Sequence, residues 1–268
     1  MGRFENLVVV KLGGSLITNK DIPESPNFHN MKLVCREISQ AISTDKSLQL
    51  ILIHGGGSFG HYFARKFGLG TLLKRNASPE GLARTAAAMI KLHSVMLEEL
   101  NSAGVFCGTI LPIEILSRNG DSISAIGESR IITLLENGLV PITFGNVSVI
   151  ENGSFIISGD TIALAIARKF RIRKATFAMD VDGVYRSAGL KGSIIHELIG
   201  EPQFKSTLRD FDVTGGLQAK IKTGFELSKL GADVFFLNGS KRNRLSKVLL
   251  GDNRVLATKI YSRGKSTL

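Results

Sequence analysis

The chain has 268 residues, of which 43% are hydrophobic and 21% are charged, as is usual for globular proteins. No apolar run approaches the roughly 20 residues that a membrane-spanning helix needs, so the sequence predicts no membrane segment. The net charge of +11 raises the question of a nucleic-acid partner, but the basic residues are scattered and tryptophan is absent, which argues against a stacking platform for single strands. A positive field that attracts small phosphorylated molecules explains the charge equally well.

The start of the chain and its cysteines indicate the compartment. The N-terminal segment passes almost directly into a predicted strand, Leu7–Leu12, without the charged, apolar and cleavage regions of a signal peptide. Cys35 and Cys107 lie among apolar neighbours and lack metal-ligand spacing, so we expect buried, reduced thiols and no metal site. These features predict a cytoplasmic protein.

The first predicted strand, Leu7–Leu12, is apolar except for Lys11, which suits the centre of a parallel sheet. Glycines and a serine follow it at 13–15. A lysine at the end of a buried strand needs a counter-charge, because burying an unpaired ammonium group is costly. A phosphate group would supply that charge. The alternative is a surface lysine at a strand terminus.

A second predicted strand, Leu48–Ile53, leads into the motif His54-Gly-Gly-Gly-Ser-Phe-Gly-His61. Three consecutive glycines allow several backbone N–H groups to approach one anion. His61 is expected to open a helix over 61–67, where its imidazole could donate a charge-assisted hydrogen bond to a phosphate oxygen. A tight strand–helix turn with a solvent-facing histidine is the alternative that this motif alone leaves open.

The remaining predicted elements alternate between helices and strands. The expected helices are Met31–Ile42, Glu80–Ala103 (in which His93 is expected to be structural), Thr161–Phe170 and Leu217–Leu230. The expected strands are Val105–Leu111, Pro141–Phe144, a hairpin of Val147–Ile150 with Phe155–Ile157, Ala175–Met179, Ala232–Leu237, Val248–Leu249 and Val255–Tyr261. This alternation predicts an α/β fold, an open and mainly parallel sheet in an αβα sandwich. Because no linker or repeat interrupts it, we expect a single domain over residues 1–268.

Glycine-rich corners recur where the predicted strands end, near 13–14, 55–57, 145, 159, 183 and 215–216. Ligands bind beyond the carboxyl ends of the strands in open α/β sheets, so these corners could form one cleft. Asp160 follows one corner, where capping a helix is its simplest role. The chain lacks the Walker motif, the dinucleotide fingerprint and a serine nucleophile elbow. Glycine backbone with two lysines, an aspartate and a histidine suits phosphoryl transfer, in which the protein aligns the reactants and neutralises charge.

Five motifs stand in order along the chain: Lys11-Leu-Gly-Gly-Ser-Leu-Ile-Thr18, His54-Gly-Gly-Gly-Ser-Phe-Gly-His61, Ser158-Gly-Asp160, Asp180-Val-Asp-Gly-Val-Tyr185 and Asp212-Val-Thr-Gly-Gly216 with Lys220. Together they resemble the amino acid kinase superfamily over nearly the whole chain. The histidine that ends the second motif makes the sequence most similar to the isopentenyl phosphate kinases within it. Fosfomycin-type phosphonate kinases look similar at this point and are the alternative, together with other small-molecule kinases of the superfamily.

The resemblance implies ATP-dependent phosphorylation of isopentenyl phosphate to isopentenyl diphosphate, in isoprenoid biosynthesis by an alternative mevalonate route. It implies a phosphate-acceptor lobe over about 1–170, an ATP lobe over about 171–268, magnesium that arrives with ATP, and a homodimer. No general base is needed, because the acceptor is already an anionic phosphate. A hypothesis from another class is a non-catalytic nucleotide-sensing or nucleic-acid-binding regulator on the same fold, suggested only by the positive charge.

The resemblance also implies roles for individual residues. The implied catalytic residues are Lys11, Lys20, His61, Asp160 and Lys220. Lys11 and Lys20 would act at the transferred phosphoryl group, and Asp160 would hold the lysines by ion pairing. The implied acceptor-binding residues are Gly56, His61, Gly145 and Gly159. The implied ATP-binding residues are Lys11, Gly13, Gly14, Ser15, Gly57, Asp180, Asp182, Gly183, Tyr185, Gly215, Gly216 and Lys220.

The chain departs from the family pattern in four places, none of which is an implied catalytic residue. Asn146 stands where relatives usually carry aspartate, and Met179 replaces a common threonine. The loop after Tyr185 lacks the frequent Asp-Pro form, and Ala257-Thr258 replaces a usual Gly-Thr. These departures concern a possible charge at 146 and the contacts with adenine.

Overall fold

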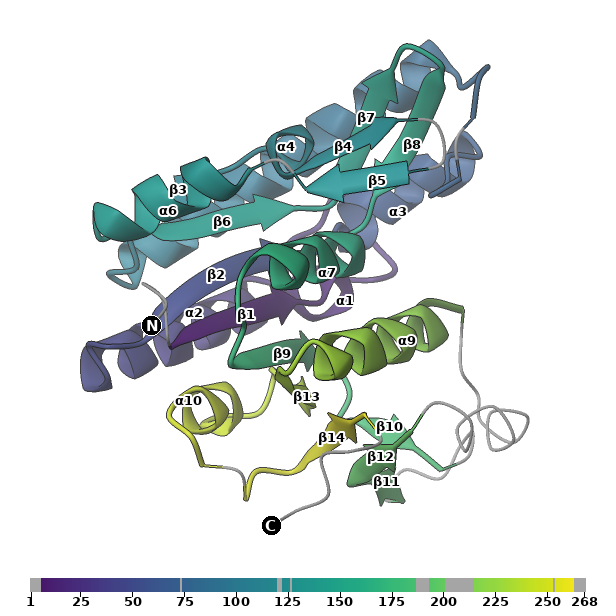
Figure 1. Ribbon diagram of the computed structural model, residues 1–268. Helices are drawn as coiled ribbons and strands as arrows, with labels where there is room; N and C mark the ends of the chain where they lie inside the picture. Colours follow the sequence, from purple (N-terminus) through teal and green to yellow (C-terminus); the bar gives the residue numbers. More distant parts are fainter. Residues whose placement is uncertain are drawn as a thin grey trace.

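The computed structural model describes residues 6–72, 74–119, 122–125, 127–186, 193–200, 215–252 and 254–262. Its centre is an eight-stranded sheet with the strand order β12-β14-β13-β9-β1-β2-β6-β3 (Figure 1). Neighbouring strands run parallel except β13 and β14, which are antiparallel. The predicted open and mainly parallel sheet is confirmed, and strands from both halves of the chain share it.

The strands of this sheet are β1 (Leu7–Leu12), β2 (Gln49–His54), β3 (Cys107–Thr109), β6 (Val140–Phe144), β9 (Lys174–Met179), β12 (Glu197–Ile199), β13 (Asp233–Asn238) and β14 (Ala257–Tyr261). Smaller antiparallel pairs are β4 (Leu116–Asn119) with β5 (Ser122–Ala125), β7 (Asn146–Ile150) with β8 (Gly153–Ile157), and β10 (Val184–Tyr185) with β11 (Ile194–Ile195). The helices are α1 (Gly14–Ile17), α2 (Phe28–Thr44), α3 (Gly57–Lys66), α4 (Pro79–Ser102), α5 (Pro112–Ile115), α6 (Glu128–Glu136), α7 (Gly159–Lys169), α9 (Gly215–Lys229) and α10 (Arg244–Leu249).

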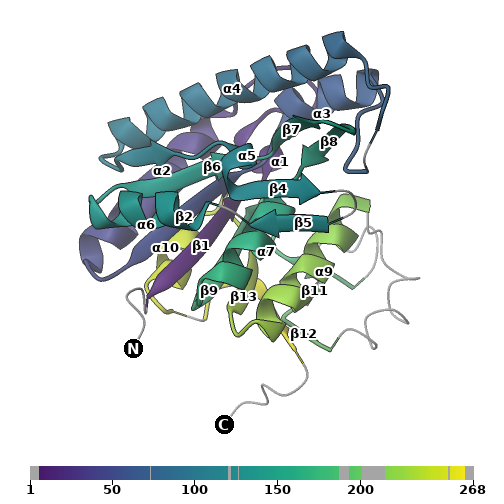
Figure 2. The same cartoon turned by 45° about the horizontal axis from the view of Figure 1, so that its top comes forward.

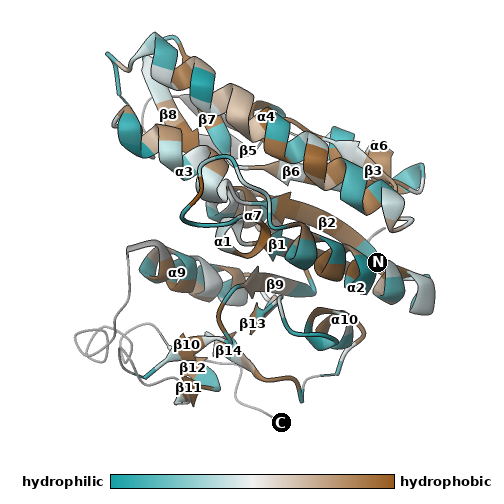
Figure 3. Cartoon of the chain, turned by 180° about the vertical axis from the view of Figure 1, so that it is seen from behind, coloured by the Kyte–Doolittle hydropathy of each residue, from teal (hydrophilic) through white to brown (hydrophobic). Residues whose placement is uncertain are grey.

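Helices cover both faces of the sheet. The side chains of β1 alternate, with Leu7 and Val9 in one apolar cluster and Val8, Val10 and Leu12 in the other. The first cluster is completed by α6, α7 and α9, which lie in front of the sheet in Figure 1. The second is completed by α2, α4 and α10, seen from behind in Figure 3, and α4 lies along α3 (Figure 2). Burial on both faces explains why the central strands read as continuous apolar runs.

One strand predicted in the C-terminal region is a helix in the structure. Val248–Leu249 forms the last turn of α10 and pairs with no strand. The buried side chains of α10 include Leu245, Val248 and Leu249, which lie on one face of the helix. This helical spacing of apolar residues outweighs the β-propensity of a two-residue apolar run.

Three predicted element boundaries were also wrong. Helix α3 begins at Gly57, so His61 lies inside the helix and does not open it. Helix α9 begins at Gly215, before the predicted start at Leu217. The strand predicted at Val105–Leu111 shortens to Cys107–Thr109, because α5 begins directly after it, at Pro112.

The structure tests what the sequence predicted for the two cysteines and for membrane-spanning helices. Both cysteines are free thiols, and Cys35 is buried as expected, but Cys107 is partly exposed, so the expectation of burial is wrong for that residue. Burial raises the pKa of the Cys35 thiol and raises that of Cys107 to about 12, so neither is a reactive thiolate at neutral pH. Within the described ranges, no helix combines the length and apolar character required to span a bilayer. Nor do three or more His, Cys, Asp or Glu side chains gather there as a metal site would require.

Candidate active site

The loops that follow β1 and β2 touch backbone to backbone at the carboxyl edge of the sheet. A Cβ atom on Gly14 would lie 2.1 Å from the nitrogen of Gly57, and one on Gly57 would lie 2.5 Å from the oxygen of Gly14. Gly57 also has a φ of +47°, which disfavours any residue with a side chain. Both positions therefore require glycine.

Thr18 fastens these two loops together. Its hydroxyl donates to the carbonyl oxygen of Gly14 over 2.8 Å and accepts from the N–H of Ser58 over 2.9 Å. The residue is only 2% exposed. The sequence placed Thr18 at the end of a motif without assigning it a task, and the structure shows that it fixes the relative position of the glycine loops.

Asp160 bridges two lysines that lie far apart in the sequence. Its Oδ1 is 3.1 Å from Nζ of Lys11, and its Oδ2 is 3.4 Å from Nζ of Lys220. Lys11 stands at the end of β1 and is 5% exposed, whereas Lys220 comes from the first turns of α9. Figure 1 shows the carboxyl end of β1 and the starts of α7 and α9 at the same edge of the sheet. Two ammonium groups thus share one carboxylate, which leaves a net positive charge.

The charges in this cluster support one another. Burial lowers the pKa of Lys11, while the neighbouring carboxylate of Asp160 opposes that shift. Burial alone would raise the pKa of Asp160, but the charges of Lys11 and Lys220 outweigh it, and the pKa lies below its usual value. Asp160 is therefore ionised at neutral pH, and it holds the two ammonium groups in place.

Capping, the simplest role for Asp160, was the wrong alternative. The N-cap of α7 is Ser158, whose hydroxyl accepts from the N–H of Thr161 over 3.1 Å. Asp160 lies in the first turn, where the helix dipole favours a negative charge. Its carboxylate is thereby available to the lysines.

Glycines from three loops lie close to the ends of β1 and β2. Gly159 packs against that lysine, since a Cβ there would lie 3.4 Å from Cε of Lys11. Gly145 donates its N–H to the carbonyl oxygen of His54 over 3.2 Å. A Cβ on Gly56 would lie 2.9 Å from the sulfur of Met89, so α4 packs directly onto this loop. Three of the predicted acceptor-binding glycines therefore lie close together around the end of β2.

His61 lies on α3 with an exposed side chain. The pKa of its imidazole is lowered, first by partial burial of the ring and then by the positive charges of Lys220, Lys11 and Arg65. Both bridged lysines thus oppose protonation of this ring. A neutral imidazole beside two cations is poised to gain a proton when an anion enters the cleft.

A second carboxylate, Asp180, holds the loop after β1 from the other side. Its Oδ1 accepts from the hydroxyl of Ser15 over 2.8 Å, and its Oδ2 lies 2.5 Å from Nζ of Lys20. These bonds outweigh burial and lower the pKa of Asp180. We expected Asp160 to hold the lysines, and it does pair with Lys11 and Lys220, whereas Lys20 pairs with Asp180. The N–H of Gly13 donates to Ala178 over 2.8 Å, so it is not the free phosphate donor that we expected.

Asp182 is the centre of a network that the sequence did not reveal. Its Oδ1 accepts from Nδ2 of Asn238 over 3.0 Å and from Nη1 of Arg244 over 2.5 Å. Its backbone N–H donates to the hydroxyl of Tyr185 over 3.4 Å. Arg244 stood in a basic run that we interpreted as scattered surface charge. The position of Asn238 at the end of a central strand was the signal that could have identified this network.

Thr258 anchors the adjoining turn, where the chain departs from the family pattern. Its hydroxyl accepts from the N–H of Val184 over 2.8 Å and donates to the carbonyl of Ile195 over 2.6 Å. A Cβ on Gly183 would lie 2.5 Å from that hydroxyl oxygen, so this glycine allows the contact. Gly183 and Tyr185 thus lie in a turn that is held to β14.

The last predicted motif lies partly within the described residues. Gly215 and Gly216 form the beginning of α9, which carries Lys220. The preceding residues Asp212, Val213 and Thr214, and the loop over 187–192, lie outside the described residues.

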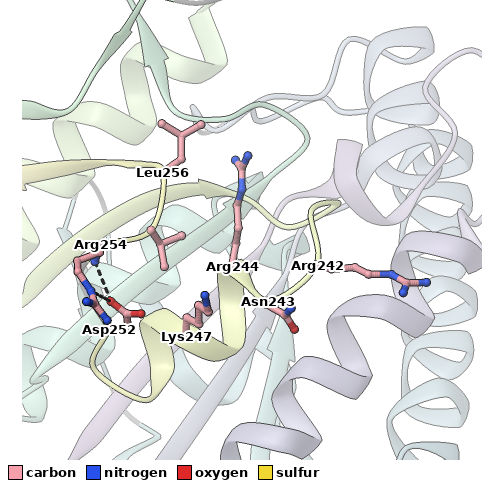
Figure 4. Close-up of a pocket in the computed structure, with 8 residues that line it drawn as sticks. Arg242, Asn243, Arg244, Lys247, Asp252, Arg254 and Leu256 are labelled. Carbon is pink, nitrogen blue, oxygen red and sulfur yellow. Dashed lines mark hydrogen bonds and ion pairs between the residues drawn. The ribbon is translucent and has the colours of Figure 1, made fainter.

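A separate pocket of about 390 Å³ lies beside α10 and is lined by Arg242, Asn243, Arg244, Lys247, Asp252, Arg254, Val255 and Leu256. Figure 4 shows Arg242 and Arg244 pointing away from Lys247, while Arg254 folds onto Asp252 with Nε and Oδ1 3.1 Å apart. The positive groups do not converge on one point. The structure therefore gives this pocket no anion site, and Arg244 serves Asp182 instead.

An open α/β sheet whose glycine loops meet two lysines bridged by a buried aspartate defines a small-molecule kinase. The sequence profile of the amino acid kinase family matches residues 6–238, and the chain belongs to that family. The resemblance stated from the five motifs is confirmed.

Individual relatives agree with this placement. The chain is 31% identical over 255 residues to the isopentenyl phosphate kinase of Methanocaldococcus jannaschii, covering 92% of this chain and 96% of the relative. It is 28% identical to that of Methanothermobacter thermautotrophicus, covering 96% and 100%. Among solved structures, an isopentenyl phosphate kinase superposes with a TM-score of 0.79 at 26% identity, covering 95% of this chain and 99% of that one. The chain is also 24% identical to an acetylglutamate kinase of Campylobacter jejuni, covering 89% of this chain and 86% of the relative.

Proposed function

We propose that this protein is an isopentenyl phosphate kinase, which transfers the γ-phosphoryl group of ATP to isopentenyl phosphate and forms isopentenyl diphosphate for isoprenoid biosynthesis. The observation that carries the proposal is the bridge from Asp160 to Lys11 and Lys220, next to the glycine loop that leads to His61. Relatives that bear this activity in their names align over nearly the whole chain, which supports the choice of acceptor.

The reaction forms a bond between an acceptor phosphate oxygen and the γ-phosphorus, and breaks the bond between that phosphorus and the oxygen bridging it to the β-phosphate. An acceptor that is already anionic has no proton to remove, so the residues of the cleft act by position and charge. Lys11 and Lys220 offset the charge on the transferred group. Asp160 holds both ammonium groups before the substrates arrive, which avoids reorganisation during the reaction. Lys20, paired with Asp180, assists from the side of the nucleotide.

On the acceptor side, the N–H of Gly56 and the imidazole of His61 hold the phosphate of isopentenyl phosphate. Gly145 and Gly159 let the loop at 158–159 approach Gly145 and Lys11 closely, because a Cβ on either would meet neighbouring protein atoms at 3.1 Å. These acceptor residues belong to the N-terminal half, about 1–170.

On the nucleotide side, ATP lies over the C-terminal half, about 171–268. The proposed contacts are Lys11, Gly14, Ser15, Gly57, Asp180, Asp182, Gly183, Tyr185, Gly215, Gly216 and Lys220. The positive lysines and glycine loops are a donor set that fits a chain of phosphates. Magnesium, carried with ATP, neutralises phosphate charge when bound.

The proposal includes a homodimer that acts in the cytoplasm. Its structural support is the edge strand β3, beside which Phe106 is 64% exposed, Leu111 46% and Ile113 43%. Apolar side chains gathered at an open sheet edge are typical of a surface that a second copy covers. Light scattering of the purified protein measures the molecular mass and tests this part.

The test of the activity is an ADP-release assay with isopentenyl phosphate, fosfomycin and N-acetylglutamate as competing acceptors, with acceptor-free ATP hydrolysis as the control. We expect the highest kcat/KM with isopentenyl phosphate, and mass spectrometry should identify its diphosphate as the product. Turnover with a carboxylate alone, or with fosfomycin alone, would show that the proposed acceptor is wrong.

A further inference from the structure

Two buried histidines form a hydrogen-bonded chain beneath the glycine loop. His54, at the end of β2, is fully buried, and His93 of α4 is 6% exposed. Nδ1 of His54 lies 3.2 Å from the carbonyl oxygen of Gly55, and Nε2 of His54 lies 3.0 Å from Nδ1 of His93. Nε2 of His93 lies 2.8 Å from the hydroxyl oxygen of Thr109. His54 opens the second family motif, but the proposed mechanism gives none of these three side chains a role.

The direction of every bond in the chain follows from its two ends. Burial lowers the pKa of His54 to about 3 and that of His93 to about 4, so each ring carries one proton at neutral pH. A carbonyl oxygen can only accept, so Nδ1 of His54 holds the proton and donates to Gly55. Nε2 of His54 must then accept from Nδ1 of His93. Nε2 of His93 must in turn accept from the hydroxyl of Thr109.

Stacking keeps the two rings in the planes that these bonds need. The ring of Phe144 lies 5.3 Å from that of His54 and 4.4 Å from that of His93, with interplanar angles of 11° and 27°. The two imidazoles stack on each other at 5.3 Å and 17°. Because all three rings are buried, turning one of them would disturb close packing as well as hydrogen bonds.

The last bond of the chain fixes a peptide plane in the cleft. The carbonyl and the N–H of a trans peptide point in opposite directions. Since the carbonyl of Gly55 faces the ring of His54, the N–H of Gly56 points away from the buried histidines. Among the residues that the structure describes, none accepts a hydrogen bond from this N–H.

We propose that Thr109, His93 and His54 are positioning residues, which hold the Gly55–Gly56 peptide so that the N–H of Gly56 is presented to the phosphate of the acceptor. The inference rests on the proposed function, because that function assigns Gly56 to the acceptor. None of the three side chains touches the substrate. A histidine pair that only filled the core would stabilise the protein without a separate effect on the acceptor.

The first test reads the chain directly, without any substrate. Nitrogen-15 NMR of the imidazoles in the ligand-free protein at neutral pH should show the proton on Nδ1 of both His54 and His93. A proton on Nε2 of His54 would reverse the chain and overturn the proposal.

The second test compares two substitutions at one position. His93→Phe keeps a stacked ring but removes the donor to His54, whereas His93→Asn can still place an amide N–H near the position of Nδ1. Losing one neutral hydrogen bond should raise the acceptor KM roughly 3- to 10-fold in His93→Phe. The KM for ATP should stay unchanged, and His93→Asn should recover part of the loss. If the two KM values rise together, or neither rises, the proposal is wrong.

Thr109→Val is a gentler variant at the far end of the chain, because it keeps the volume and removes only the hydroxyl that donates to His93. We expect a smaller rise in the acceptor KM and a mixture of imidazole tautomers. An unchanged tautomer pattern together with an unchanged KM would contradict the assigned direction.

Inorganic phosphate separates this inference from the proposed function. Its binding can be followed by the NMR shift of the Gly56 amide in the native protein and in His93→Phe. If isopentenyl phosphate is not a substrate but phosphate binds at least threefold more weakly to His93→Phe, the acceptor is wrong and the positioning role stands. If isopentenyl phosphate is turned over with equal KM by both proteins, the function stands and the positioning role is wrong.

Discussion

The proposed acceptor side and the proposed nucleotide side of the cleft are held by different kinds of interaction. On the acceptor side the contacts join neutral groups: Gly56 packs on Met89 of α4, and the carbonyl of Gly55 lies against the buried imidazole of His54, which is hydrogen-bonded to His93. On the nucleotide side, carboxylates pair with cations, as Asp180 does with Lys20 and Asp182 with Arg244. Lys20 is 60% exposed, so solvent and salt weaken its ion pair.

Under the proposed assignment of the two sides, this difference indicates how each substrate would be selected. Buried neutral hydrogen bonds keep their geometry at any ionic strength, which suits a pocket that must select one small acceptor. Partly exposed ion pairs yield to a charged ligand, which suits a nucleotide that brings its own charges. Asp160 combines the two kinds of interaction: it is charged, as the groups on the nucleotide side are, and it is largely buried, as the histidines on the acceptor side are.

The largest effect is expected where the two regions meet. Lys11→Ala removes a preorganised charge from the transferred group, so kcat should fall ~10²–10³-fold, measured by ADP release at saturating substrates. The control is Lys32→Ala on the exposed face of α2, which changes the net charge equally and should leave kcat unchanged. An unchanged kcat in Lys11→Ala would remove this lysine from the mechanism.

His61→Ala tests the acceptor side alone. A hydrogen bond from a charged imidazole to a phosphate contributes about 1.5–3 kcal/mol, so the acceptor KM should rise roughly 10- to 100-fold. The KM for ATP should stay within twofold of the native value. His29→Ala, an exposed histidine of α2, serves as the control. A parallel rise in the KM for ATP would contradict the assignment of His61 to the acceptor alone.

The buried histidines make the acceptor side sensitive to acid. Their pKa values fall from 6.5 to about 3 and about 4 on folding, so the unfolded chain binds more protons below pH 6.5. Stability must therefore decrease as the pH falls through this range. At pH 5 each histidine should cost roughly 2 kcal/mol relative to pH 7, at about 1.4 kcal/mol per pH unit. Urea unfolding at both pH values should show a smaller loss in His93→Phe; an equal loss would contradict the burial of a neutral ring.

The smallest effect concerns the nucleotide side and originates in α2. Glu37 is buried, and its carboxylate accepts from the N–H groups of Asn243 and Ser246, which caps α10 and so places Arg244 beside Asp182. Glu37→Gln keeps one acceptor oxygen, so we expect a loss of about 1 kcal/mol and a two- to threefold rise in the KM for ATP.

The acceptor KM should not change in Glu37→Gln, and Glu98→Gln on the exposed face of α4 is the matched control. Thermal unfolding and steady-state kinetics give both quantities. Equal changes in the two KM values would mean that Glu37 acts only through overall stability.

The alternation of strands and helices predicted the sheet, and the resemblance to the kinase family implied that Asp160 pairs with lysines, as it does with Lys11 and Lys220. It did not predict the partners of these groups. The bond between His54 and His93 joins residues 39 positions apart, and that between Asp182 and Arg244 joins residues 62 apart. Such pairs depend on how helices dock onto the sheet, which no local period encodes. The short apolar pair Val248–Leu249 failed for a related reason, since a two-residue run fits a helix face as well as a strand.

The contact between Gly14 and Gly57 has a consequence for how this enzyme could acquire new substrates. Where these loops touch, main chain lies directly against main chain, and no side chain separates them. A side chain at either position would push the loops apart and displace the proposed ATP contacts that both carry. A broader range of acceptors is therefore better sought by substitution at Met89, the adaptable side chain through which α4 meets the loop at Gly56.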